Sequence, residues 1–138
     1  MKPTALSLLP RYDWLRKVTV TKRPIIEKAS PIITPQRVAR FEDILTRAEK
    51  ELIFVLFLID LSSNDKSKLN EVVYLAKTPG MLKGFMTAEI ATKAIKFFIS
   101  WQIEAPHKTQ TLIEQLLSPE EYANILGSIL QKYHKIFF

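Results

Sequence analysis

The residue types that could do chemistry in this chain are basic and aromatic side chains interleaved near its start, in the sequence RYDWLRK at residues 11–17. Lys and Arg neutralise phosphate groups, and aromatic rings stack on unpaired bases, so this mixture is typical of contacts to nucleic acid. The predicted nucleic-acid-binding set is Arg11, Tyr12, Trp14, Arg16, Lys17, Lys22, Arg23 and Lys28. No motif that reads base sequence accompanies these residues, so the expected contact is to the backbone of DNA or RNA.

The charge around this set is unevenly distributed along the chain. Residues 1–40 hold nine Lys or Arg and two acidic residues, a net charge of +7, whereas the other 98 residues hold eleven basic and twelve acidic residues, a net charge of −1. A field concentrated on one segment indicates an acidic partner. Two alternatives to nucleic acid stay open. The basic segment could dock on an acidic protein surface, or its charges could be solvated while Tyr12 and Trp14 pack onto the rest of the chain.

Catalytic and metal-binding chemistry has little support in the sequence. His107 and His134 lie 27 residues apart with no cluster of carboxylates near either, and the chain has no Cys. The segment PGMLKGF at residues 79–85 fits no phosphate-binding glycine pattern, and we predict it as a tight connection between helices. We therefore expect no catalytic residue, no metal and no cofactor.

A second candidate site is apolar. The run LIFVLFLI at residues 52–59 is hydrophobic on every face of a helix, so we expect it to be the central rod of the fold or part of an oligomer interface. The chain also ends in two phenylalanines, which would fold back onto the core or, if exposed, dock on a partner. The predicted partner interface is Phe54, Phe57, Leu58, Phe137 and Phe138.

The elements that position these sites divide into an arm and a body. Five of the eight prolines fall in the first 35 residues, which predicts an extended, proline-rich basic arm over residues 1–33. Within it we expect a helical turn over residues 11–17 and a short strand over residues 18–21. Isoleucine pairs at 25–26 and 32–33 are too apolar to stay in water, so the arm is predicted to be strapped along the body.

The body, residues 34–138, shows helical periodicity throughout. We predict helices over residues 35–61, 66–77, 88–103, 109–117 and from 119 to the end. Thr34, Thr87 and Ser118 are the expected caps of the first, third and last of these, with a capping box at Ser118. The predicted fold class is all-α, an irregular bundle of about five helices.

Length and composition complete the prediction. The 138 residues suit one helical domain, the longest apolar run has eight residues, and the absence of Cys fits a reducing compartment. Prolines and charges interrupt a secretion signal, and the prolines also interrupt the long amphipathic helix of an organelle presequence. We therefore expect an intracellular protein of the cytoplasm or nucleoid, with organelle import as the disfavoured alternative. The leading hypothesis is a non-catalytic accessory subunit of a nucleoprotein complex. The alternative is a protein-protein adaptor or scaffold, possibly homo-oligomeric, whose arm binds an acidic protein; the oligomeric state is left open.

Overall fold

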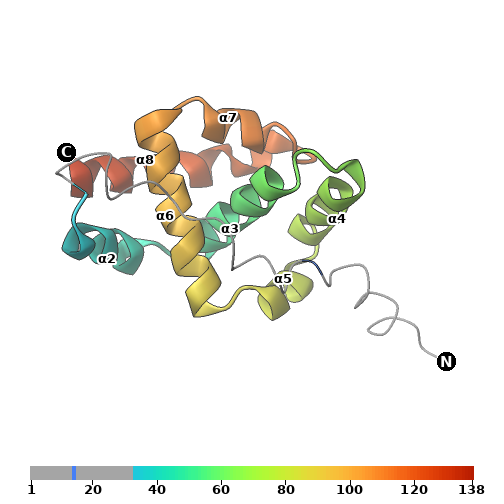
Figure 1. Cartoon of the computed structure of the whole chain (residues 1–138), viewed down its shortest axis with the longest axis horizontal. Coiled ribbons are helices and arrows are strands. Elements are labelled where there is room, and N and C mark those ends of the chain that lie inside the picture. Colours follow the sequence, from blue (N-terminus) through green and yellow to red (C-terminus); the bar gives the residue numbers. More distant parts are fainter. Residues whose placement is uncertain (1–13, 15–32) are drawn as a thin grey trace.

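The computed structural model describes Trp14 and residues 33–138; residues 1–13 and 15–32, with the turn and strand predicted there, lie outside the described part. The described residues form seven α-helices, one short 3-10 helix and no strand, which confirms the all-α irregular bundle (Figure 1). The elements are α2 (Pro35–Ile44), α3 (Arg47–Leu61), α4 (Lys66–Ala76), α5 (Pro79–Phe85), α6 (Ala88–Glu104), α7 (Lys108–Ile113), η2 (Pro119–Tyr122) and α8 (Ala123–Phe137).

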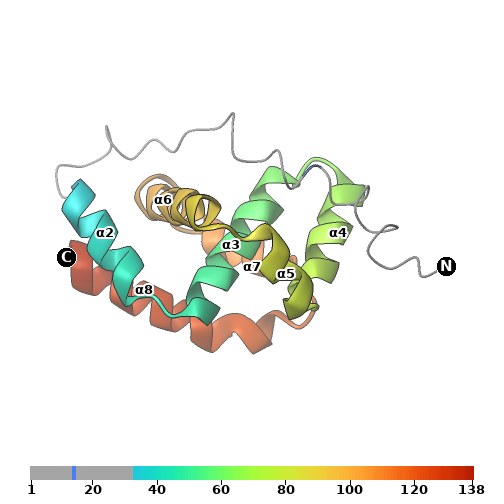
Figure 2. The same cartoon turned by 90° about the horizontal axis from the view of Figure 1, so that it is seen from below.

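Helix α3 is the centre of the bundle. It packs against α4, α6, α7 and α8, while α2 and α4 lie at opposite ends of the molecule (Figure 2). Every residue from Leu52 to Ile59 is at most 4% exposed. A helix that is apolar on all sides has to be enclosed to be stable, and the other helices enclose this one. The prediction of a central rod is therefore confirmed.

The long helix predicted over residues 35–61 is interrupted. Leu45 and Thr46 have extended backbone conformations and separate α2 from α3. Thr46 caps α3, because its hydroxyl accepts from the N–H of Glu49 and the Glu49 carboxylate accepts from the N–H of Thr46. This capping box is present in the sequence as Thr-x-x-Glu, inside the segment predicted as one continuous helix. Ala48, an apolar residue of that segment, is exposed.

Two other local predictions need correction. The segment predicted as a tight connection is the short helix α5, with a proline at its start. Ser118 does not cap the last helix: its φ of 57° is left-handed, its side chain makes no capping hydrogen bond, and the 3-10 turn η2 precedes α8. The caps expected at Thr34 and Thr87 are confirmed, since each hydroxyl accepts from the backbone N–H three residues later.

An aromatic cluster closes the bundle at the end near the C-terminus. The ring of Phe41 on α2 lies 6.1 Å from that of Phe98 on α6, and 5.8 Å from that of Phe137 on α8. Ile136 and Phe137 are buried, so most of the terminal apolar segment folds back onto the core. The last residue, Phe138, remains 81% exposed.

Candidate functional site

The arm contacts the body at Trp14. Its indole N–H donates to Oε1 of Glu71 at 2.8 Å, and Nζ of Lys68 lies 5.3 Å from the centre of the ring. Lys68 and Glu71 are three residues apart on α4, so they share one face of that helix. Trp14 is also half-buried and packs against the core. Hydrogen bonding, a cation–π contact and packing together fasten this residue to α4.

Trp14 is the single member of the predicted nucleic-acid-binding set that lies within the described residues. The other seven, Arg11, Tyr12, Arg16, Lys17, Lys22, Arg23 and Lys28, lie outside them. In this structure the indole N–H of Trp14 donates to the carboxylate of Glu71, and the ammonium of Lys68 lies over its ring. The residue is therefore an anchor on the body here and does not present its ring for base stacking.

The predicted partner interface lies largely inside the fold. Phe54, Phe57 and Leu58 are at most 1% exposed in the single chain, because α4, α6, α7 and α8 surround the helix that carries them. They have no surface with which to bind a partner, so the expectation of an interface there does not hold in the folded chain. Phe137 is likewise buried at 2% exposure. Phe138 is the one exposed member of the predicted set, and its ring lies 5.2 Å from that of His134.

A buried carboxylate that we did not predict joins three helices. Glu49 is 4% exposed and accepts hydrogen bonds from Oγ of Ser128 at 2.6 Å and from Nζ of Lys132 at 2.7 Å. The ammonium of Lys132 also donates to the carbonyl of Ile44 at 3.0 Å. These contacts tie the end of α2 and the start of α3 to α8. The capping box at Thr46 was the sequence signal for Glu49, whereas its partners on α8 are 79 and 83 residues away.

The environment of Glu49 keeps it charged. Burial raises the pKa of its carboxyl, but hydrogen bonds from Lys132 and Ser128 and from the N–H of Thr46 outweigh burial. The pKa of Glu49 therefore lies below its ordinary value of 4.5. The carboxylate, the hydroxyl and the ammonium of this cluster all make contacts within the chain, so the cluster fastens the helices together.

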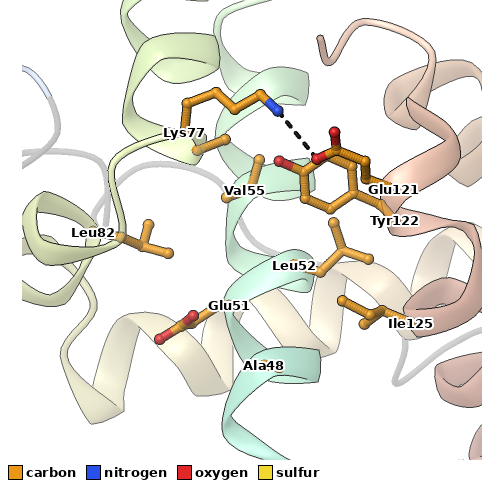
Figure 3. A pocket seen from close by; sticks show the side chains of 10 residues that line it. Ala48, Glu51, Leu52, Val55, Lys77, Leu82, Glu121, Tyr122 and Ile125 are labelled. Atoms are coloured by element: carbon orange, nitrogen blue, oxygen red, sulfur yellow. Dashed lines mark hydrogen bonds and ion pairs between the residues drawn. The ribbon is translucent and has the colours of Figure 1, made fainter. Parts of the chain in front are cut away.

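The surface between α3, α4, α5 and the start of α8 is hollowed (Figure 3). This hollow has a volume of about 320 Å³, apolar walls that include Leu52, Val55 and Ile125, and a polar rim. An ion pair of 3.1 Å between Lys77 on one side and Glu121 on the other crosses the space between α4 and η2.

A second hollow lies between α7, η2 and α8. Its volume is about 470 Å³, and Ile113, Leu126 and Leu130 contribute apolar side chains to its lining. The charged residues in this lining are Glu114 and Glu120. The two hollows therefore flank the same short element, η2.

A third hollow, of about 230 Å³, lies where the arm joins the body. It is lined by Ile33 and the start of α2 on one side and by Thr92 and Lys96 of α6 on the other. The hydroxyl of Thr92 donates to Oε2 of Glu42 at 2.8 Å, which links α6 to α2. Ile33 packs against the core, so the last residue of the predicted arm is attached to the body.

The described histidines and carboxylates are spread over the body. His107 and His134 are both exposed and lie on different elements. Within residues 33–138 and Trp14, no three His, Asp or Glu side chains come together as a metal site would require. Several described carboxylates take part in caps or ion pairs, such as Asp65 at the start of α4 and Asp60 with Lys108 at 2.8 Å.

The described residues thus form an all-α irregular bundle. No protein-family model matches the chain, and no curated protein and no solved structure matches it significantly. None of the helices in the described part of the chain is long and apolar enough to cross a lipid bilayer.

Proposed function

We propose that this protein is a non-catalytic accessory subunit of a nucleoprotein complex, in which the basic arm binds the phosphate backbone and the helical body docks on a protein. The observation that carries the proposal is the docking of Trp14 on α4 through Glu71 and Lys68. Attachment at Trp14 limits how far the neighbouring basic residues of the arm can lie from α4, which favours a concentrated positive field.

The charges of the body near this anchor support the proposal. Helices α4 and α5 carry Lys66, Lys68 and Lys83. The acidic groups on α4 are already engaged, because Asp65 caps the helix and Glu71 accepts from Trp14. Trp14 is therefore attached to a lysine-bearing part of the body. Arg16 and Lys17 follow Trp14 by two and three residues, so chain connectivity keeps them within roughly 7–11 Å of it, measured between Cα atoms.

The docking of Trp14 on α4 also supports the adaptor hypothesis. A Trp14 side chain that is engaged with α4 is not presented to stack on bases, which leaves Tyr12 as the one aromatic candidate for stacking in the predicted set and increases the share of charge in binding. An acidic protein surface can be bound through charge as well as a phosphate backbone can. The experiment therefore has to offer both kinds of polyanion to the protein.

The test is fluorescence anisotropy with labelled single-stranded DNA, duplex DNA and RNA of mixed sequence, over a range of salt concentrations. We expect binding to all three, with an affinity that falls linearly in a double-logarithmic plot against salt. Reversing four arm charges should abolish binding, and reversing four body charges away from α4 should have a far smaller effect. The arm set is Arg16, Lys17, Lys22 and Arg23, and the body set is Arg40, Lys50, Lys93 and Lys135, all changed to Glu.

Two results would decide against the proposal. Absence of binding to every nucleic acid at low salt would remove the nucleic-acid function. Binding to polyglutamate that is stronger than binding to DNA or RNA, and that is lost in the arm variant, would support the adaptor in its place.

A further inference from the structure

We propose that the surface around η2 is a docking site for a basic, apolar segment of another protein. This proposal rests on the protein-docking role of the body in the proposed function, and it names the surface and the class of partner. The starting observation is that two hollows, of about 320 Å³ and about 470 Å³, lie on either side of the same four-residue element.

Both hollows offer apolar surface to a partner. Ala48 of α3 and Ile125 of α8 line the first, Ala123 and Leu130 of α8 line the second, and none of these four is fully buried. Leu117, in the link between α7 and η2, is 58% exposed. An amphipathic helix presents apolar side chains three and four positions apart on one face, so several of them can contact apolar surface at once.

The charged residues that line the hollows indicate which charge the partner should carry. Glu51 and Glu121 line the first hollow, and Glu114 and Glu120 line the second. Both carboxylates of the first hollow are paired, Glu121 with Lys77 at 3.1 Å and Glu51 with Arg47 at 3.2 Å. The described lining of the second hollow includes no cationic residue, so the negative charge of Glu114 and Glu120 is not compensated there, and charge complementarity favours a cationic partner.

The partner is another protein and not the arm of a second copy. The arm of this chain is basic, but its two described residues are attached to their own body, Trp14 on α4 and Ile33, two residues before α2, against the core. The stretch of chain between these two attachments is less available to a neighbouring molecule. A free basic segment from a different protein has no such restraint.

Gly127 provides a way to close the second hollow without unfolding the chain. It lines that hollow within α8, and a Cβ atom added to it would meet no atom within 4 Å. Leucine is a far better helix former than glycine. Gly127→Leu is therefore expected to fill the hollow while leaving the helix at least as stable. Gly84→Leu is the matched control, because Gly84 is also helical, also has open space around it, and lines neither hollow.

The experiment measures binding of a labelled 14-residue Lys/Leu amphipathic peptide to the full chain by fluorescence anisotropy. We expect binding that weakens with salt. A Glu/Leu peptide with the same apolar spacing can meet the basic arm but not the hollows, so any binding that it shows should be unchanged in Gly127→Leu. Gly127→Leu should weaken binding of the Lys/Leu peptide more than tenfold. The double variant Glu114→Gln/Glu120→Gln should weaken it about three- to tenfold, as expected for two exposed ion pairs. Gly84→Leu and the double variant Asp43→Asn/Glu89→Gln should bind as the unmodified chain does.

Three outcomes would overturn the proposal. Binding of the Glu/Leu peptide that Gly127→Leu weakens as much as it weakens binding of the Lys/Leu peptide would show that the surface does not distinguish the charge of its partner. Unchanged binding by a Gly127→Leu chain with a native circular dichroism spectrum would place the peptide elsewhere. Dimerisation in sedimentation experiments that Gly127→Leu abolishes would make a second copy the occupant.

The same variants separate this proposal from the proposed function. Gly127→Leu should leave the affinity for nucleic acid unchanged, because Gly127 is not on the arm or on α4. If nucleic acid does not bind but the Lys/Leu peptide still does, the role of the arm is wrong and the docking surface stands.

Discussion

At the scale of single residues, Glu49 shows how a buried charge can hold a bundle together. Its carboxylate is 4% exposed, a position that is costly for an ion unless donors surround it. Ser128 and Lys132, both on α8, supply two of those donors. Removal of one donor is more damaging than the net value of the contact, because the remaining charge stays buried.

Lys132→Met is therefore expected to lower the free energy of unfolding by about 2 kcal/mol. The control is Arg47→Met, which breaks an exposed ion pair of 3.2 Å with Glu51 within α3. Such pairs contribute about 0.3–0.5 kcal/mol. Urea unfolding of both variants measures the difference, and equal losses would mean that burial of Glu49 has no special cost.

The lowered pKa of Glu49 makes stability depend on pH. A group whose pKa is lower in the folded than in the unfolded chain stabilises the fold above its unfolded value, here about 4.5, and this stabilisation is lost as pH falls through the folded pKa. Between pH 6 and pH 3 the unmodified chain should lose more stability than Glu49→Gln does. Urea unfolding at the two pH values tests this, and parallel losses would contradict it.

At the scale of elements, the sequence predicted helices well and their interruptions poorly. Periodicity located the helical segments because apolar residues recur wherever a helix faces the core. The same apolar periodicity continues through the break at Leu45 and Thr46, so it gave no sign of that break. The capping box at Thr46 outweighs the periodicity there, since it satisfies backbone groups at the helix end. At Ser118 the converse error occurred: the capping pattern is present, but the left-handed backbone turns the side chain away from that role.

The break between α2 and α3 can be tested through its cap. Thr46→Ala should destabilise the chain by about 1 kcal/mol, because the backbone N–H of Glu49 loses the hydroxyl that accepts from it. Thr46→Ser should retain most of the stability, since its hydroxyl can make the same hydrogen bond. Thermal unfolding of the two variants gives the comparison. If the alanine variant matched the unmodified chain, packing of Leu45 would be what sets the break.

At the scale of the whole molecule, the candidate site was less predictable than the fold. The asymmetric charge is visible in the sequence, but the attachment of Trp14 depends on Glu71, which is 57 residues away, and no local pattern encodes such a contact. The prediction of an interface at Phe54 and Phe57 was wrong for a related reason. A sequence shows that a helix is apolar on all sides, but not how many neighbours enclose it.

The anchor makes a prediction about the arm as a unit. Trp14→Ala removes the hydrogen bond to Glu71 and the contact with Lys68, so tryptic cleavage within residues 15–32 should become about tenfold faster. Trp14→Phe keeps a ring but not the N–H donor and should be intermediate. Time courses of limited proteolysis provide the measurement, and equal rates in all three chains would exclude an anchoring role.

The central position of α3 has a consequence for synthesis of the chain. Helix α3 ends at Leu61, whereas α8, which covers it last, ends at Phe137, 76 residues later. At a translation rate of ~5–20 residues per second, this delay is roughly 4–15 s. During that time the most hydrophobic segment of the protein has been made but its enclosure has not. The nascent chain is thus expected to need protection from aggregation until its C-terminal helix emerges from the ribosome.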